Sequence, residues 1–209
     1  MITLVDYGMG NLRSVAKAFE FLGAEVRLTS DPVDVAQAGA IILPGVGHFG
    51  DGMRELRERG LAASLRTAIA AGTPFLGICL GMQLLLGESE EAPGVPGLGV
   101  FPGRVVRFPA GELKVPHMGW NQLRFSRPSP LFDGLADGIW CYFVHSYHCV
   151  PDDPALVLAT SGYGLDVAAA IGRDRVFATQ FHPEKSQDGG LAMLRNFLRL
   201  ATGAAGSRA

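Results

Sequence analysis

One cysteine in the sequence stands where a side chain could act as a nucleophile. Cys79 is the middle residue of the run 77–81, Gly-Ile-Cys-Leu-Gly, which follows an apolar stretch typical of a buried strand and precedes helical spacing at 82–86. Glycines on both sides let the chain turn tightly enough to present one side chain above a sheet, as in a nucleophile elbow. The helix dipole and unpaired backbone N–H groups favour a thiolate at the start of a helix. We therefore predict that Cys79 is a nucleophile and not merely a small buried side chain.

A cysteine nucleophile needs a general base, and the base needs a group that orients it. His182 and Glu184 are separated only by Pro183, at the end of a run that is typical of a strand (176–181). Side chains two residues apart in an extended chain point the same way, about 6 to 7 Å apart along the backbone. The carboxylate can then hold one imidazole nitrogen while the other nitrogen faces the thiol. We expect a triad of Cys79, His182 and Glu184.

A glycine-rich run at 45–50, Gly-Val-Gly-His-Phe-Gly, fits the G-x-G-x-x-G pattern of dinucleotide-binding loops. It follows the third expected strand instead of the first, and the next strand ends on Cys79 where a ribose-binding acid would be needed. We therefore do not expect a dinucleotide site. Small residues here would instead expose backbone N–H groups beside the cysteine and, with the amide of Leu80, form an oxyanion hole. A plain glycine-rich turn is the alternative.

The remaining cysteines and three of the histidines carry weaker signals. Cys141 and Cys149 lie in or beside strand-like runs, and we assign them to packing. His145 and His148 would face opposite sides of a strand, so that both could not hold one metal ion without a bend. Nothing beyond its location marks His117.

Alternating strands and helices must position these residues. In the first half, four apolar runs predict strands, and they lie at 2–5, 25–28, 40–43 and 75–79. Helical spacing appears between them at 12–22 and 61–71, and Gly23 is expected to cap the first helix. This alternation predicts a parallel sheet covered by helices.

The second half contains short strand candidates punctuated by Gly, Pro and Asp, which predict antiparallel additions to the same sheet. These candidates are 100–108, 113–115, 139–144, 156–159, 168–171 and 176–181. A hairpin turn is expected at 172–174, a surface loop at 87–99 and a helix at 188–200. The expected fold class is α/β, with a central, mostly parallel sheet, antiparallel additions and helices on both faces. We expect one domain at 1–202 and a flexible tail at 203–209.

Length and charge exclude several classes of function. The 209 residues suit one domain, and 18 basic against 20 acidic residues give a net charge of -2. No basic excess is available to bind nucleic acid or an anionic membrane. The longest apolar run, 75–86, is too short to span a bilayer, the start has no basic leader-like segment, and the three cysteines lack paired spacing. We expect a soluble cytoplasmic protein.

The combination of the elbow with Phe-His-Pro-Glu at 181–184 resembles the class I glutamine amidotransferases, a family with a Cys-His-Glu triad in this chain order. Three further runs resemble the glutaminase subunits of imidazole glycerol phosphate synthases, from histidine biosynthesis. They are Asp-Tyr-Gly-Met-Gly-Asn at 6–11, Lys-Val-Pro-His-Met-Gly-Trp-Asn at 114–121 and Tyr-Phe-Val-His-Ser-Tyr at 142–147. The similarity extends from residue 2 to about residue 200, and no triad position departs from the family pattern.

The resemblance implies a role for each matching residue. Cys79 would attack the carboxamide carbon of glutamine, His182 would protonate the departing ammonia and later activate water, and Glu184 would orient His182. The implied oxyanion hole is lined by Gly45, Val46, Gly47 and Leu80, with a turn near Val46 that would reorient in the active state. The implied glutamine-binding residues are Gln83, His145 and Ser146. The positions implied to face a partner are Asn11, Trp120, Tyr142 and Lys185. No metal and no organic cofactor are implied.

The implied partner is a separate cyclase subunit, a TIM barrel in this family. A glutaminase domain accounts for all the residues, so the acceptor of the ammonia would lie on another polypeptide, reached through a channel in a heterodimer. The products there would be imidazole glycerol phosphate and aminoimidazole carboxamide ribotide, and the glutaminase would stay nearly idle until the acceptor binds. The alternatives are a glutaminase subunit of another amidotransferase, a catalytically silent regulatory homologue, and a peptidase-like hydrolase on the same elbow.

Overall fold

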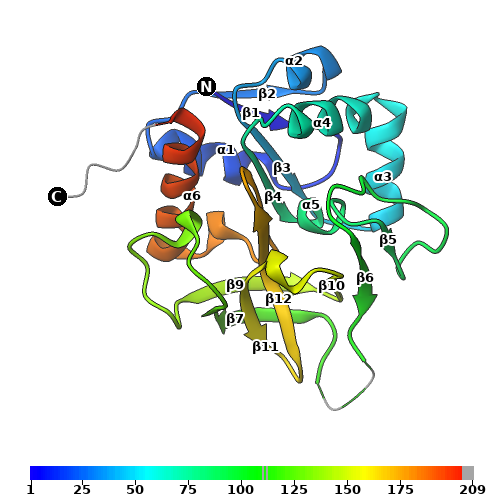
Figure 1. Cartoon of the computed structure of the whole chain (residues 1–209), viewed down its shortest axis with the longest axis vertical. Coiled ribbons are helices and arrows are strands. Elements are labelled where there is room, and N and C mark those ends of the chain that lie inside the picture. The colour runs from blue at the N-terminus through cyan, green and yellow to red at the C-terminus, as the bar shows by residue number, and fades with distance from the viewer. Residues whose placement is uncertain (110, 112, 204–209) are drawn as a thin grey trace.

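An eight-stranded sheet runs through the centre of the molecule, in the order β2-β1-β3-β4-β13-β12-β11-β8 (Figure 1). The structure is a computed structural model, and it describes residues 1–109, 111 and 113–203. Five neighbouring strands are parallel: β1 (Ile2–Val5), β2 (Val26–Thr29), β3 (Ile41–Gly45), β4 (Phe75–Cys79) and β13 (Val176–Thr179). All of them except β2 are buried along their whole length, as parallel strands covered on both faces must be.

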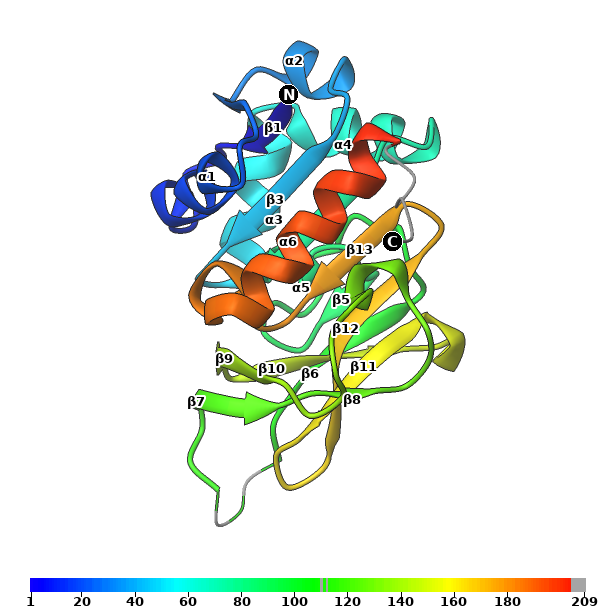
Figure 2. The ribbon, with the colours of Figure 1, turned by 90° about the vertical axis from the view of Figure 1, so that its left-hand side faces the viewer.

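Helices cover both faces of this parallel part (Figure 2). One face packs against α1 (Leu12–Phe21) and α6 (Gln187–Thr202), and the other against α2 (Pro32–Ala36), α3 (Phe49–Glu58) and α4 (Leu61–Ala70). The side chains of β3 divide between the two cores, since Ile41 and Leu43 face α3 and α4 while Ile42 faces α1 and α6. A single short helix, α5 (Leu80–Gln83), follows β4 directly. The predicted α/β class with helices on both faces is confirmed.

Antiparallel strands extend the sheet on the side of β13. They are β12 (Asp166–Arg173), β11 (Val157–Gly162) and β8 (Arg124–Phe125), with a tight turn after Arg173 as predicted. Two smaller sheets stand apart from the main one. The first is formed by β10 (Tyr147–Pro151), β6 (Gly103–Arg107) and β5 (Glu88–Ser89), and the second by β7 (His117–Gln122) and β9 (Trp140–His145). Three single 3-10 turns complete the described elements: η1 (Pro130–Phe132), η2 (Pro154–Leu156) and η3 (Pro183–Lys185).

Several expectations need correction. The strand candidates at 100–108 and 139–144 belong to the small sheets, not to the main sheet. No strand forms at 113–115, because Pro116 has no backbone N–H for a ladder and the strand starts only at His117. The helix after Cys79 begins at Leu80, two residues earlier than expected, and ends at Gln83. The loop at 87–99 contains the two-residue strand β5, and the segments β10 and α2 were not anticipated at all.

The last helix of the described residues is closed by a glycine. Helix α6 ends at Thr202, where the left-handed backbone of Gly203 (φ 67°) caps it, and the rest of the expected tail lies outside the described residues. Within the described part of the chain, no helix combines the length and the apolar character needed to cross a bilayer.

Candidate active site

The backbone at Cys79 is held in a strained conformation by close packing. Cys79 ends β4 and has φ 56° and ψ −108°, which few residues other than glycine adopt. A Cβ atom at Gly81 would collide with the carbonyl of Leu43 on β3, and one at Gly77 would lie 2.7 Å from the Gly81 carbonyl oxygen. Strand, elbow and helix therefore fit together only because both flanking residues are glycines. The arrangement has the form of the predicted nucleophile elbow.

The second chain segment of the site reaches Cys79 through strand pairing. Because β13 runs parallel to β4, the ends of both strands lie at the same edge of the sheet, and His182 follows β13. His182 Nδ1 donates to Glu184 Oε1 at 2.8 Å, and the two side chains are 4% and 1% exposed. Among the described residues, neither His182 Nε2 nor Glu184 Oε2 has a hydrogen-bond partner. The imidazole is thus oriented by the carboxylate and keeps its second nitrogen free.

The charges around His182 favour its protonated form. Burial lowers the pKa of His182, but the neighbouring Cys79 and Glu184 outweigh burial and raise the pKa to about 9. A protonated His182 can give its proton to a leaving group.

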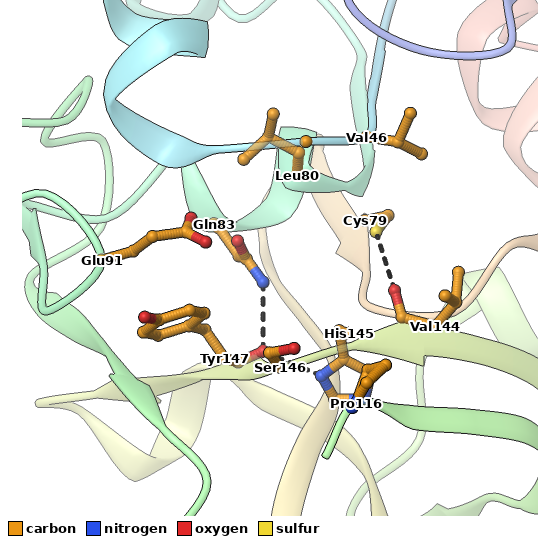
Figure 3. A pocket seen from close by; sticks show the side chains of 11 residues that line it. Val46, Cys79, Leu80, Gln83, Glu91, Pro116, Val144, His145, Ser146 and Tyr147 are labelled. Carbon is orange, nitrogen blue, oxygen red and sulfur yellow. Dashed lines mark hydrogen bonds between the residues drawn. The ribbon is translucent and has the colours of Figure 1, made fainter.

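Two further groups surround the Cys79 sulfur. The carbonyl oxygen of Val144 on β9 lies 4.0 Å from Sγ (Figure 3), and Gln180 Nε2 donates to Sγ at 3.7 Å. Gln180 is fully buried and two residues before His182, and it was missed in the sequence because nothing in a strand pattern marks one buried amide. Its N–H group supports negative charge on sulfur.

A cavity of about 270 Å³ opens beside Cys79 (Figure 3). Such a volume suits one small molecule. The residues predicted from the sequence that line it are Val46, Gly47, Cys79, Leu80, Gln83, His145 and Ser146. The lining residues that sequence reasoning missed are Glu91, Pro116, Val144 and Tyr147. Glu91 follows β5, Pro116 precedes β7, and Val144 and Tyr147 lie on β9 and β10, segments whose placement no local pattern indicates.

The expected oxyanion turn lies next to the elbow. Gly45 pairs with Cys79 across β3 and β4, and Val46 and Gly47 continue from it to the cavity wall. Gly45 itself lies behind the wall, where a Cβ atom would meet the Leu80 side chain at 3.0 Å. The backbone of this turn is therefore adjacent to the thiol, and its role in binding an oxyanion stays a prediction.

A buried tyrosine supports the same turn and was missed in the sequence. Tyr7 is 0% exposed, and a Cβ atom at Gly45 would collide with its hydroxyl. Within the described residues, the Tyr7 hydroxyl has no hydrogen-bond partner. Burial, and to a lesser extent the charge at Cys79, raise the pKa of Tyr7. Gly45 is thus a glycine because Tyr7 fills the space of its side chain.

Three of the expected partner-facing residues lie close to one another. Trp120 and Tyr142 pair across β7 and β9 with ring centroids 6.1 Å apart, and Lys185 Nζ lies 5.8 Å from the Tyr142 ring. By alternation, Met118 and Trp140 share this face, and they are 62% and 55% exposed. Asn11, in contrast, caps α1 by accepting from the Ser14 N–H at 3.3 Å. We call the exposed side of β7 and β9, formed by Met118, Trp120, Trp140 and Tyr142, the aromatic face.

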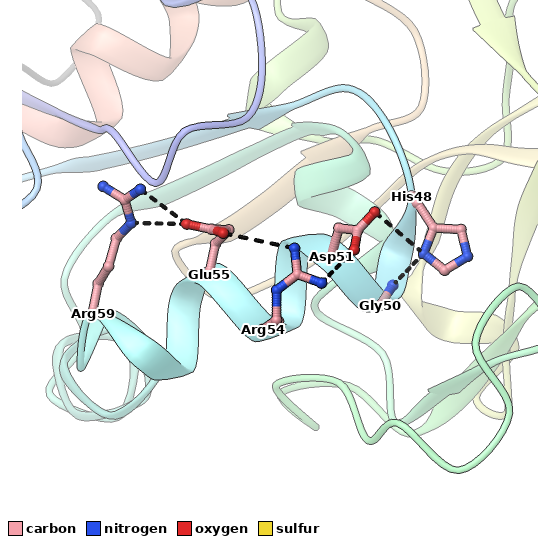
Figure 4. A network of polar contacts seen from close by, with 6 residues as sticks. All are labelled: His48, Gly50, Asp51, Arg54, Glu55 and Arg59. Carbon is pink, nitrogen blue, oxygen red and sulfur yellow. Dashed lines mark hydrogen bonds and ion pairs between the residues drawn. The ribbon is translucent and has the colours of Figure 1, made fainter.

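The histidine of the glycine-rich run has a structural explanation. His48 is the N-cap of α3, where its Nδ1 accepts from the Gly50 N–H at 3.1 Å and its Nε2 donates to the Glu91 carbonyl at 3.0 Å. A ladder of exposed charges continues along the helix (Figure 4), in which Asp51 binds Arg54 at 2.7 Å. The ladder goes on through Glu55 to Arg59.

Known proteins resemble this chain over nearly its whole length. The family model described as Glutamine amidotransferase class-I matches residues 3–201. The imidazole glycerol phosphate synthase subunit HisH of Geobacillus kaustophilus is 57% identical, with 97% of this chain and 98% of the relative covered. The protein of the same name from Methanothermobacter thermautotrophicus is 52% identical, with 96% and 98% covered.

Solved structures share the fold. One described as a crystal structure of glutamine amidotransferase has a TM-score of 0.77 at 25% identity and covers 97% of this chain and 100% of its own. The PurLQS structure from Thermotoga maritima has a TM-score of 0.75 at 22% identity, with 95% and 97% covered. Together with the elbow, the oriented imidazole and the adjoining cavity, these similarities lead to one assignment: the chain belongs to the class I glutamine amidotransferase family.

Proposed function

We propose that this chain is the glutaminase subunit of an imidazole glycerol phosphate synthase, which releases ammonia from glutamine for a separate cyclase chain. The observation that carries the proposal is the position of Cys79 on the wall of a cavity of about 270 Å³, with the His182–Glu184 pair following the neighbouring parallel strand at the same edge of the sheet. The relatives named HisH support the choice of this synthase over other amidotransferases, because they match over the full length of the chain.

The proposed reaction proceeds through a thioester. The Cys79 thiolate attacks the carboxamide carbon of glutamine, and the oxygen of that carboxamide takes up the negative charge. The C–N bond breaks as His182 gives its proton to the nitrogen, which leaves as ammonia. Neutral His182 then takes a proton from water, which hydrolyses the thioester to glutamate and restores the thiol. Glu184 holds His182 in the orientation that both proton transfers require.

The cavity walls support the other roles in this reaction. The backbone of Val46, Gly47 and Leu80 adjoins Cys79 and is placed to stabilise the oxyanion. Gln83, His145 and Ser146 line the part of the cavity in which the amino-acid end of glutamine would lie. Gln83 is held for this role, since its Nε2 donates to the Tyr147 carbonyl and to Gln180 Oε1, both at 3.1 Å.

The aromatic face is the proposed contact surface for the cyclase. Monomeric proteins rarely leave several large aromatic side chains together in solvent, and Trp120, Trp140 and Met118 are all more than two-fifths exposed. This face lies on β9, the strand whose Val144 carbonyl touches the thiol, so ammonia released there would have a short path to a partner chain. The three free cysteines fit a reducing cytoplasm, where we place the complex.

Covalent labelling by an electrophilic glutamine analogue tests the proposal. The full chain is incubated with the analogue, with and without the cyclase chain, and the labelled residue is identified by mass spectrometry. We expect label on Cys79, faster in the complex, and none in Cys79→Ser. Cys141→Ser is the matched control, because burial raises the pKa of that thiol to about 12 and labelling should be unchanged.

Product analysis of the complex tests the choice of synthase. With glutamine and the cyclase substrate, the wild-type complex should form glutamate and imidazole glycerol phosphate in equal amounts. Label on a residue other than Cys79, or glutamate formation that survives Cys79→Ser, would overturn the glutaminase assignment. Glutamate formation without imidazole glycerol phosphate would instead indicate a different amidotransferase.

A further inference from the structure

A chain of hydrogen bonds leads from β7 into the wall of the cavity. It begins at Asn121, whose amide orientation is fixed by two other bonds: Oδ1 accepts from the Gln122 N–H at 2.8 Å, and Nδ2 donates to the Gly162 carbonyl at 2.9 Å. Nδ2 also lies 3.2 Å from His117 Nε2. An amide nitrogen can only donate, so His117 Nε2 accepts.

The other end of this series of hydrogen bonds independently fixes the same donor-to-acceptor direction. His145 Nδ1 lies 2.8 Å from the Tyr147 carbonyl oxygen, which can only accept, so this nitrogen carries a proton. Between the two ends, His117 Nδ1 and His145 Nε2 are 3.0 Å apart. If both imidazoles carry one proton, on Nδ1, every contact joins a donor to an acceptor. The Asn121 end and the Tyr147 end of the series lead to the same assignment.

The surroundings keep both rings neutral and in place. His117 and His145 are 3% and 5% exposed. Burial lowers the pKa of His117 to about 4 and, as the main cause, that of His145 to about 3. The His117 ring is stacked between Phe143 and Tyr163, with centroid distances of 4.8 and 4.0 Å and interplanar angles of 22° and 21°. Neither ring gains a second proton at neutral pH, so the hydrogen bonds keep the same donor-to-acceptor direction from Asn121 to the Tyr147 carbonyl.

We propose that Asn121 and His117 are positioning residues for the glutamine pocket, acting by a directed relay that fixes the tautomer of His145 and thereby the Tyr147 carbonyl. That carbonyl also anchors Gln83, whose Nε2 donates to it at 3.1 Å. The proposal deepens the proposed function, because it identifies what holds two walls of its substrate cavity. Asn121 is half-buried in β7, outside the cavity lining, and His117 is likewise not in contact with the cavity.

The relay matters because the wrong tautomer would place two acceptors face to face. Without a donor at His117, His145 Nε2 loses its partner, and only the Tyr147 carbonyl still favours a proton on Nδ1. In the fraction of molecules with the proton on Nε2, a bare Nδ1 would lie 2.8 Å from the Tyr147 carbonyl oxygen. The carbonyl would have to turn away, and Gln83 would lose one of its two anchors. Glutamine binding should weaken, while the hydrogen bond between His182 and Glu184 is left in place.

Imidazole ¹⁵N NMR of the full chain tests the relay directly. We expect both His117 and His145 as Nδ1–H tautomers in the wild type. In His117→Phe, which keeps an aromatic ring between Phe143 and Tyr163, His145 should no longer be confined to that tautomer. An Nε2–H tautomer of either histidine in the wild type would overturn the proposal.

Glutaminase kinetics of the complex with the cyclase chain supply the second readout. For His117→Phe and Asn121→Ala, we expect KM for glutamine to rise about tenfold with kcat changed less than about threefold, as for the loss of one buried hydrogen bond in binding. His117→Gln can accept and donate in the same direction and should restore KM more fully than phenylalanine does. Tyr163→Phe, which keeps the stacked ring, is the packing control and should leave KM unchanged.

The two readouts separate this proposal from the function on which it rests. Unchanged KM in both His117→Phe and Asn121→Ala, with His145 still an Nδ1–H tautomer, would overturn the relay even if Cys79 is labelled as expected. If no variant or wild-type complex turned over glutamine, the proposed function would fail, and the tautomers would still decide whether the relay exists.

Discussion

Two neighbouring strands of the sheet end at the same edge, yet the chain leaves them in different ways. After β4 there is no connecting turn, because Cys79 is the last strand residue and α5 begins at Leu80. After β3, Val46, Gly47 and His48 lead to α3, whose first turn is capped by the His48 side chain. Gly45 and Cys79 are register partners, so the two junctions start side by side.

The difference lies in how tightly each junction is packed. At the β4 junction, Gly81 lies against the backbone of β3 and leaves no room for a methyl group. At the β3 junction, a Cβ atom at Gly47 would meet only the tip of the flexible Met9 side chain, at 2.8 Å. The thiol is therefore fixed by contacts between backbones, whereas the neighbouring turn has space to change conformation. The following predictions test this contrast.

Replacing Gly81 by alanine should have the largest effect on stability. The added methyl group collides with the Leu43 carbonyl, which a strand buried on both faces cannot move, so we expect a loss of about 3 to 5 kcal/mol in the free energy of unfolding. Chemical denaturation measures it. Gly39→Ala, with nothing within 4 Å of the new atom, is the matched control. Equal stability of the two variants would contradict the tight packing of the elbow.

Replacing Glu184 by glutamine should have the next largest effect, which we expect on catalytic activity. The change removes the charge that orients and stabilises protonated His182, so kcat should fall about 100-fold or more. The pKa of His182 should drop below its native value of about 9, which NMR titration of the imidazole would detect.

His182 should also make the stability of the folded protein depend on pH. The sign of this dependence follows from its raised pKa. Folding raises the pKa of His182 from 6.5 to about 9, so protonation favours the folded state. This contribution is present in full below pH 6.5 and is lost as the pH rises through about 9. In Glu184→Gln the loss should occur at lower pH. A wild-type His182 that titrates at or below 6.5 would contradict the stabilisation of its protonated form in the folded state.

Replacing Gly47 by alanine should cost about 1 to 2 kcal/mol of stability, because its φ of 116° disfavours any side chain although the space is nearly open. Thermal or chemical unfolding measures the cost. A loss as large as that of Gly81→Ala would show that this turn is as tightly packed as the elbow, which would remove the contrast.

The smallest effect on stability and activity is expected from a substitution on the exposed side of α3. Arg54 and Asp51 form an exposed ion pair, 55% and 47% accessible, and such pairs contribute little in water. Arg54→Ala should leave the denaturation midpoint within experimental error and glutaminase activity unchanged. A clear loss of either would mean that the ladder of charges supports the β3 junction.

The elbow and the hydrogen bond between His182 and Glu184 were predictable because each depends on local sequence. The glycines around Cys79, and the spacing of His182 and Glu184, indicate their geometry within a few residues. Gln180 was not predictable, since it acts on a sulfur 101 positions away in the sequence. Nothing in the sequence beyond its location marked His117, which the fold places between two aromatic rings and two hydrogen-bonding partners.

The strands also differ in how much of their placement the sequence predicts. The parallel strands were found because each is a continuous apolar run buried on both faces. The separate sheets of β6 and β9 could not be told from additions to the main sheet, because one-sided alternation looks the same wherever the strand pairs.

The position of β13 also governs when the protein becomes chemically competent. This strand, near the end of the chain, inserts between β4 and β12 and brings the imidazole with it. A ribosome that has released only the first 170 or so residues holds a thiol without its base, beside an unpaired strand edge. Amide-cleaving capacity thus arises only after residues 176–184 have been made, so that a nascent chain that stops before them cannot waste glutamine.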